Sequence, residues 1–246
     1  MKRHSWEILL GLSLLVLSVV FYLIHYVIFR DAHHIFIYLV GDIAFVFIEV
    51  LLVTLIIHQL LSIREKRARM EKLNMVIGSF FSEVGTRLLT LFSDLDPNLE
   101  KIRSELIVTR NWSEENFCAV GKRLKEYEYS VDIDKIHINR LREYLIEKRD
   151  FLLRLLENPN LLEHEAFTDV LQAVFHLTEE LAAREDTSQL PPSDFTHIAA
   201  DIKRAYVLLI RQWVDYMKYL KNNYPYLFSL AARQNPFDQS ASVVVL

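Results

Sequence analysis

The sequence predicts an all-α protein, in which an N-terminal two-helix transmembrane hairpin is followed by a cytoplasmic helical bundle. Two apolar runs of membrane-spanning length occupy most of the first 62 residues. Beyond them, apolar residues recur at spacings of three and four, which is the period of an amphipathic helix. Only 5 Gly and 6 Pro occur among 246 residues, and strand-like alternation is nearly absent. Together these observations disfavour a sheet.

Composition divides the chain into a membrane part and a soluble part. The change falls near residue 63, where charged sequence replaces the apolar runs. We expect a transmembrane hairpin over 1–62, a basic and amphipathic juxtamembrane helix over 63–93, a helical bundle over 94–233 and a C-terminal tail over 234–246. A soluble part of about 180 residues buries roughly 70% of the surface that its unfolded chain exposes, so its core requires neither disulfides nor a cofactor.

The first apolar run extends from Trp6 to Phe29. Its roughly 24 residues, at about 1.5 Å each, are long enough to cross the roughly 30 Å hydrocarbon core of a bilayer. A cleaved signal peptide has a shorter apolar run followed by a small-x-small cleavage site, which is missing here. The run therefore predicts a spanning helix over about 6–29.

The second apolar run covers about 35–61 and follows a five-residue link, Arg30 to His34. A link this short makes the two spans antiparallel. Lys2 and Arg3 precede the first span and a basic cluster follows the second, whereas Arg30 is the one Lys or Arg of the link. Because basic flanks remain in the cytoplasm, we expect both termini on the cytoplasmic side and the link outside.

The basic cluster lies directly after the second span. Residues 64–72 contain five Lys or Arg against two Glu: the basic ones are Arg64, Lys66, Arg67, Arg69 and Lys72. Such a cluster attracts anionic headgroups, so membrane lipids are an expected partner.

The chain after this cluster holds 20 basic and 26 acidic side chains, a net charge of −6. An acidic domain repels phosphate backbones, so no nucleic-acid partner is expected.

The most informative ionisable residues of the apolar runs are His25 in the first run and Asp42 and Glu49 in the second. A charge at the bilayer centre costs about 2.5–3.5 kcal/mol on insertion scales. Asp42 and Glu49 are seven residues apart and so share one helix face. Antiparallel packing would bring His25 to a depth similar to that of Asp42.

Three interpretations of this face stay open. The acids can hydrogen-bond within or between hairpins and hold the helices together. Several hairpins can instead surround a pore that rings of Asp42 and Glu49 make cation-selective. The third interpretation is a proton relay or sensor that includes His25.

The soluble part reads as a series of helices. An apolar stripe over 73–91 predicts a helix that ends near Asp94, and this stripe packs either within the chain or between chains. Caps, prolines and apolar spacing then predict helices over about 97–108, 113–129, 134–157, 163–184 and 194–222, with a short apolar helix after Pro225. Short connections imply antiparallel neighbours.

The weak metal candidates lie at the starts of two of these helices. They are Asp134 with His137 and Asp194 with His197, and the end of the helix between them carries Glu179 and Glu180. Carboxylates with histidines three residues later build metal sites in helical bundles. However, capping alone explains an Asp at a helix start, so no metal is expected. The lone Cys118 excludes a multi-cysteine site within one chain.

Two stretches, HHIFIYLVGDIAFVFIEVLLVTLIIHQLL and KLNMVIGSFFSEVG, together with NPFD near the end, carry a resemblance. The sequence resembles a set of uncharacterised prokaryotic two-span membrane proteins. The resemblance covers about a third of the chain and implies a bacterial or archaeal plasma membrane. It implies no activity and no functional residues.

We therefore predict a membrane-anchored helical interaction or regulatory module that forms a homo-oligomer and binds a cytoplasmic protein partner. The sequence contains no phosphate-binding glycine loop, nucleophile elbow or HExxH helix, so we predict no catalytic residues and no enzyme. The alternative is an oligomeric cation channel or transporter subunit with Asp42 and Glu49 along the pathway. A metal-dependent enzyme is a more remote alternative.

Overall fold

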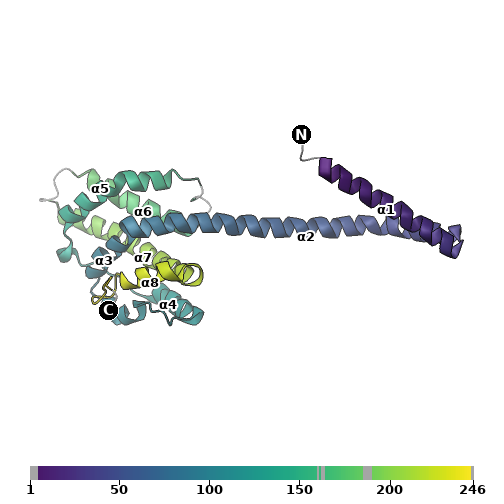
Figure 1. Cartoon of the computed structure of the whole chain (residues 1–246). Coiled ribbons are helices and arrows are strands. Elements are labelled where there is room, and N and C mark those ends of the chain that lie inside the picture. Colours follow the sequence, from purple (N-terminus) through teal and green to yellow (C-terminus); the bar gives the residue numbers. More distant parts are fainter. Residues whose placement is uncertain (1–4, 160, 162–163, 185–189, 245–246) are drawn as a thin grey trace. The chain divides into compact units, whose positions relative to one another are not determined.

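A computed structural model of the chain is all-α, which confirms the predicted fold class (Figure 1). The structure describes residues 5–159, 161, 164–184 and 190–244, and no strand occurs among them. The chain consists of two compact units, an N-terminal unit, Met1–Lys66, and a C-terminal unit, Arg67–Leu246. Lys2 and Arg3, which support the predicted orientation, lie outside the described residues.

The N-terminal unit contains α1 (Ser5–Phe29) and the first part of α2 (Ala32–Phe80). The link between them is shorter than the five residues predicted. Arg30 takes a left-handed conformation with φ 48°, and the Asp31 Oδ1 accepts the backbone N–H groups of His33 and His34 at 3.0 and 3.2 Å. This cap starts α2 at Ala32, three residues earlier than the apolar run alone indicates.

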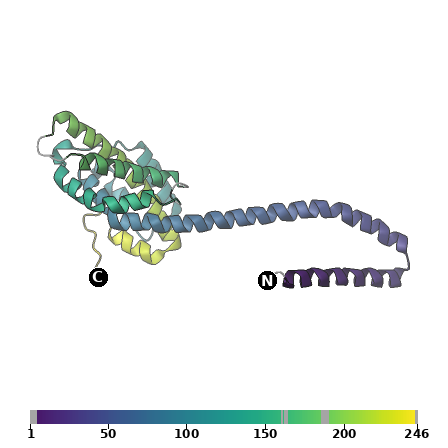
Figure 2. The ribbon, with the colours of Figure 1, turned by 90° about the horizontal axis from the view of Figure 1, so that it is seen from above.

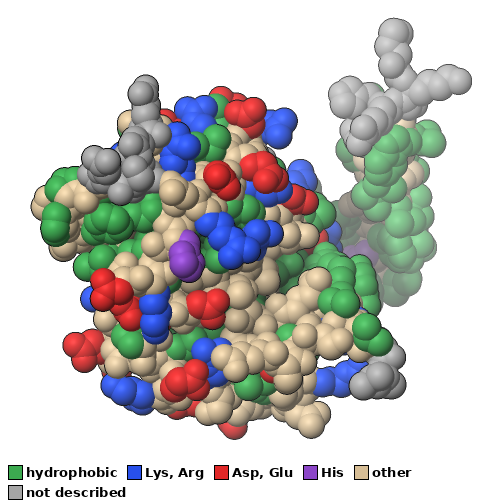
Figure 3. All heavy atoms as spheres, turned by 90° about the vertical axis from the view of Figure 1, so that its left-hand side faces the viewer, with side chains coloured by type: hydrophobic (Ala, Val, Ile, Leu, Met, Phe, Trp, Pro, Cys, Tyr) green, Lys and Arg blue, Asp and Glu red, His purple; other side chains and the backbone are tan. Residues whose placement is uncertain are grey.

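Apolar side chains cover the surface of the N-terminal unit. No described side chain between residues 8 and 66 is buried, and Leu9 and Phe47 are 70% and 74% exposed. In Figure 3, hydrophobic side chains cover the visible part of the N-terminal unit, whereas the visible face of the C-terminal unit mixes charges of both signs. By length and composition, both helices of this unit could cross a membrane.

The C-terminal end of α2 enters the bundle and then changes its winding. Residues Phe81–Gly85 form a π-helical turn, after which α3 runs from Thr86 to Asp94. The predicted helix over 63–93 is therefore interrupted. The extra residue of the π turn lets Phe80 and Phe81 both point into the core, where they are 0% and 2% exposed. A Cβ on Gly85 would lie 2.6 Å from the Phe81 Cδ1, so only glycine fits here.

The remaining helices form the bundle around α7 (Figure 2). Their bounds are α4 Glu114–Glu126, α5 Ile138–Leu156, α6 Glu165–Ala182, α7 Pro192–Asn223 and α8 Pro225–Arg233. Helix α7 packs against α3, α4, α6 and α8, while α5 packs against α6. The buried hydrophobic core runs from Leu73 to Phe237, so it lies entirely within the C-terminal unit.

One predicted helix and the start of another differ in the structure. The stretch predicted as a helix over 97–108 forms two 3-10 turns, Leu99–Lys101 and Arg103–Leu106, that are separated at Ile102. The buried Asp96 accepts a hydrogen bond from the Tyr127 hydroxyl at 2.8 Å as well as one from the nearby Asn98 N–H. This tertiary contact stabilises a turn where the sequence indicates a helix cap. Helix α5 likewise begins at Ile138, four residues after the predicted start.

The tail after α8 folds back onto the bundle. The Asn235 side-chain amide donates to the Leu106 carbonyl at 2.9 Å, and the Phe237 ring packs edge-on against Trp213 with centroids 5.2 Å apart. Both residues are buried. Residues 235–237 therefore belong to the core rather than to a free tail.

Candidate functional site

Four side chains from α6 and α7 converge at the surface of the bundle. His176 and Glu180 lie one turn apart on α6, and His197 and Asp201 lie one turn apart on α7. Because residues four apart share a helix face, each helix presents one histidine and one carboxylate to the other. We call these four residues the histidine–carboxylate cluster.

Asp201 lies at the centre of this cluster. Its Oδ2 is 3.5 Å from the His176 Nε2 and 3.4 Å from the His197 Nε2. The His197 Nε2 is also 3.5 Å from the Glu180 Oε2. The Asp201 side chain is only 2% exposed, and its Oδ2 has no hydrogen-bond partner.

Arg184 holds the carboxylates beside the cluster. Its Nε and Nη2 each lie 2.7 Å from one oxygen of Asp194, and its Nη1 lies 2.9 Å from the Glu180 Oε2. Hydrogen bonds from this guanidinium lower the pKa of both carboxyl groups below the ordinary values. Asp194 is therefore an ion-pair partner that fixes the start of α7 against the end of α6.

The structure brings together only part of the predicted metal group. His197 and Glu180 meet as the antiparallel helix order implies, but Asp194 pairs with Arg184. Asp134 lies in a 3-10 turn, Ile133–Lys135, and His137 precedes α5 beside Phe195. Among the described residues, neither of these two belongs to a group that could hold a metal ion.

Two members of the cluster, His176 and Asp201, do not follow from the pattern of an acid with a histidine three residues later. His176 has no acid three residues before it, and Asp201 has no histidine three residues after it. The signal that finds both is a histidine and a carboxylate four residues apart on two neighbouring helices, His176 with Glu180 and His197 with Asp201.

The lowered carboxyl pKa values predict how stability depends on pH. A carboxyl group with a lowered folded pKa stabilises the fold above its unfolded pKa, and this stabilisation is lost as pH falls through the folded pKa. We expect Arg184→Met to lower the free energy of unfolding by about 1 kcal/mol at pH 7. Urea unfolding measured between pH 7 and pH 3 should show that the free energy of unfolding falls more steeply with decreasing pH in the wild type than in the variant.

Arg149→Met is the matched control for this prediction. Arg149 pairs with Glu179 at 2.6 Å, but the two side chains are 40% and 44% exposed, so solvent screens the pair. If the free energy of unfolding depends on pH identically in the wild type and in Arg184→Met, Arg184 does not lower the pKa of the two carboxyl groups.

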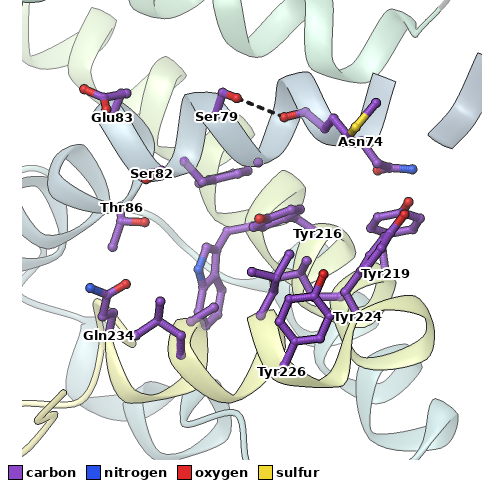
Figure 4. Close-up of a pocket in the computed structure, with 18 residues that line it drawn as sticks. Asn74, Ser79, Ser82, Glu83, Thr86, Tyr216, Tyr219, Tyr224, Tyr226 and Gln234 are labelled. Atoms are coloured by element: carbon purple, nitrogen blue, oxygen red, sulfur yellow. Dashed lines mark hydrogen bonds between the residues drawn. The ribbon is translucent and has the colours of Figure 1, made fainter. Parts of the chain in front are cut away.

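A second hollow, the aromatic groove, lies between α2, α7 and α8 (Figure 4). Its volume is about 540 Å³, and four tyrosines line it, namely Tyr216, Tyr219, Tyr224 and Tyr226. The Tyr216 ring stacks on Phe81 with centroids 5.2 Å apart, and burial raises the pKa of its hydroxyl. Met75 and Tyr226 at the groove are 62% and 71% exposed. The groove therefore offers neutral aromatic surface to solvent.

Two of the three ionisable residues singled out in the apolar runs line one hollow of the N-terminal unit. His25 and Asp42 both line a space of about 850 Å³ near the turn between α1 and α2. No hydrogen bond or ion pair joins them in the part of the chain that the structure describes; the His25 ring instead lies 4.7 Å from the Phe29 ring. Glu49 lies further from the turn and is exposed, as Asp42 is. Within a single chain, both acids are therefore uncovered.

The basic cluster projects from α2. Arg64, Lys66 and Lys72 are exposed, and Arg67 pairs with Glu71 at 3.5 Å. The side chain of Arg69 lies outside the described part of the chain. The described cations are therefore accessible to an anionic surface.

Comparisons with known proteins cover nearly the whole chain. The family model "Uncharacterized protein MJ1433, C-terminal helical domain" matches residues 69–233, and the model "MJ1433, N-terminal helical domain" matches residues 2–61. The uncharacterized protein MJ1433 of Methanocaldococcus jannaschii is 46% identical over 244 residues, which are 99% of this chain and 98% of that protein. No solved structure matches. These findings confirm the resemblance to a set of uncharacterised proteins.

Proposed function

Because the chain belongs to the MJ1433 family, in which separate helical domains form the N-terminal and C-terminal parts, we propose that it is a membrane-anchored helical interaction or regulatory module. Helices α1 and the first part of α2 form the transmembrane hairpin. The C-terminal unit is the cytoplasmic part, and the membrane is the plasma membrane of a bacterium or archaeon.

The observation that carries this proposal is the exposed apolar surface of the N-terminal unit. Burying one Leu or Phe side chain is favourable by roughly 1.5–3 kcal/mol. No described side chain from residue 8 to residue 66 obtains that stabilisation within the chain. A surface so uniformly apolar is unstable in water, whereas hydrocarbon accommodates it. The basic cluster after the apolar segment supports the cytoplasmic side for the bundle.

Oligomerisation follows from the two uncovered acids. Asp42 and Glu49 share a face of α2 and are exposed in a single chain. A carboxylate that faces lipid is costly, so this face requires a protein or water neighbour. The same face of a second copy supplies one, because side chains can then hydrogen-bond across the hairpins.

The bundle supplies the interaction surface of this module. The aromatic groove has walls from three helices and exposed apolar residues at its edge, including Met75, Tyr226 and Leu227. An amphipathic helix of a cytoplasmic protein fits a groove of this kind through its apolar face. The groove contains Asn74, which follows the end of the predicted span by thirteen residues.

A second candidate function rests on the same two acids. If several hairpins surround an aqueous pathway, Asp42 and Glu49 form rings that select cations. Cation flux through liposomes containing the purified chain, abolished by Glu49→Gln in an intact oligomer, would favour a channel over the interaction module.

Labelling of single cysteines tests the membrane topology. Cys118 is the sole cysteine of the chain and is exposed on α4 in the bundle. A membrane-impermeant maleimide added to intact spheroplasts should leave Cys118 unmodified and should label it after permeabilisation. The matched variant combines Cys118→Ser with His33→Cys, at the turn between the two helices, and should be labelled in intact spheroplasts. The reverse pattern would overturn the proposed orientation.

A further inference from the structure

We propose that the histidine–carboxylate cluster binds one divalent transition-metal ion of the Zn²⁺ class through Glu180, His197 and Asp201, with His176 beside these three ligands. This inference does not depend on the proposed membrane anchor, because all four residues belong to α6 and α7 of the C-terminal unit.

The donor atoms have the right chemistry and spacing for such an ion. Imidazole nitrogen and carboxylate oxygen are common ligands of zinc and of neighbouring divalent metals. Two ligand atoms that each lie about 2.0–2.1 Å from a tetrahedral Zn²⁺ are roughly 3.3 Å apart. Glu180, His197 and Asp201 can each offer one donor atom such that the three atoms lie within 4.8 Å of one another. The His197 Nε2 lies 3.4 Å from the Asp201 Oδ2 and 3.5 Å from the Glu180 Oε2. The His176 Nε2 lies 3.5 Å from the same Asp201 oxygen, but it faces the other Glu180 oxygen, Oε1, at 3.9 Å.

Asp201 provides an independent reason to place a cation here. Its side chain is 98% buried, yet Oδ2 accepts no hydrogen bond and points between the two histidine nitrogens. A buried carboxylate oxygen that accepts no hydrogen bond is costly, and the histidine nitrogens beside it offset this cost only when they are protonated. An ion bound to this Oδ2 and to the His197 Nε2 would offset it with neutral histidines.

The surroundings of the cluster favour a divalent cation over a neutral ligand. Arg184 and Arg204 contribute two positive charges near the site, while Glu180, Asp194 and Asp201 contribute three negative charges. The arginines hold the carboxylates from outside: Arg184 contacts the Glu180 Oε2 at 2.9 Å and Arg204 contacts the Asp201 Oδ1 at 3.2 Å. Such outer contacts orient metal ligands.

The histidines lie at the solvent side of the site. The side chains of His176 and His197 are 46% and 51% exposed. An ion can therefore reach the cluster without unfolding of the bundle, and water can complete its coordination. A bound ion would join α6 to α7 directly and so stabilise their packing.

Zinc and cobalt binding to the full-length chain in detergent tests the proposal. After removal of metal with EDTA, we expect one Zn²⁺ per chain by equilibrium dialysis and elemental analysis, together with a raised melting temperature. Co²⁺ should produce visible absorption bands. His176→Ala with His197→Ala removes both exposed histidines of the cluster with little effect on the core, and should abolish the bands and weaken Zn²⁺ binding by at least about 10-fold.

Two further variants complete the experiment. His137→Ala removes an exposed histidine outside the cluster and should bind Zn²⁺ as the wild type does. Asp201→Asn keeps the shape of the buried side chain, and should weaken binding as the histidine variant does. The proposal is overturned if the wild type binds no stoichiometric Zn²⁺, or if the cluster variants bind it as tightly as His137→Ala does.

Discussion

Replacing Phe80 by alanine should lower the free energy of unfolding of the C-terminal unit by about 3–5 kcal/mol, the usual cost of deleting a fully buried phenylalanine ring. Phe80 is 0% exposed at the point where α2 enters the bundle. Its ring packs edge-on against Phe81 and Phe167, with centroid separations of 5.4 and 5.3 Å. Loss of the ring leaves a cavity between α2 and α6.

Chemical denaturation of the purified chain, followed by the fluorescence of Trp112 and Trp213, measures this change. Phe47→Ala is the matched control, since the same side chain is 74% exposed in the N-terminal unit. It should leave the unfolding midpoint of the bundle unchanged. Equal effects of the two substitutions would show that Phe80 does not join α2 to the bundle.

The helical elements with a strong local signal could be predicted from the sequence. The apolar runs predict α1 and the first part of α2, and Ser113 predicts the start of α4. The structure confirms this start, where Ser113 and Asn116 form a capping box. In both cases the residues that decide the structure are neighbours in the chain.

Elements that depend on distant contacts could not be predicted. The π turn at Phe81–Gly85 exists because two adjacent phenylalanines both enter the core, and this depends on what α6 and α7 present to them. Asp96 looks like a helix cap in sequence, but its bond to Tyr127 comes from a segment 31 residues away. Propensity alone does not detect such contacts.

The candidate site was predicted in part for the same reason. Helix order was enough to bring His197 near Glu180. Helix order does not predict that Arg184 forms an ion pair with Asp194. It also does not predict the rotation of α6 and α7 that brings His176 and Asp201 into the cluster. The rotation of a helix about its axis is set by the face that it buries. This rotation also decides which residues of the cluster meet.

In the proposed function, the apolar residues before Arg67 anchor the bundle of the C-terminal unit in a membrane. The buried core runs from Leu73 to Phe237, so a chain of residues 67–246 contains all of it. We expect this shortened chain to be soluble and helical. The full chain should instead stay in the membrane fraction at alkaline pH and leave it only in detergent.

Fractionation of cells that express the two chains distinguishes an anchored bundle from a soluble protein. We expect the full chain in carbonate-washed membranes and residues 67–246 in the soluble fraction, with a cooperative unfolding transition. Release of the full chain by carbonate, or retention of residues 67–246 in the washed membranes, would overturn the proposed anchor.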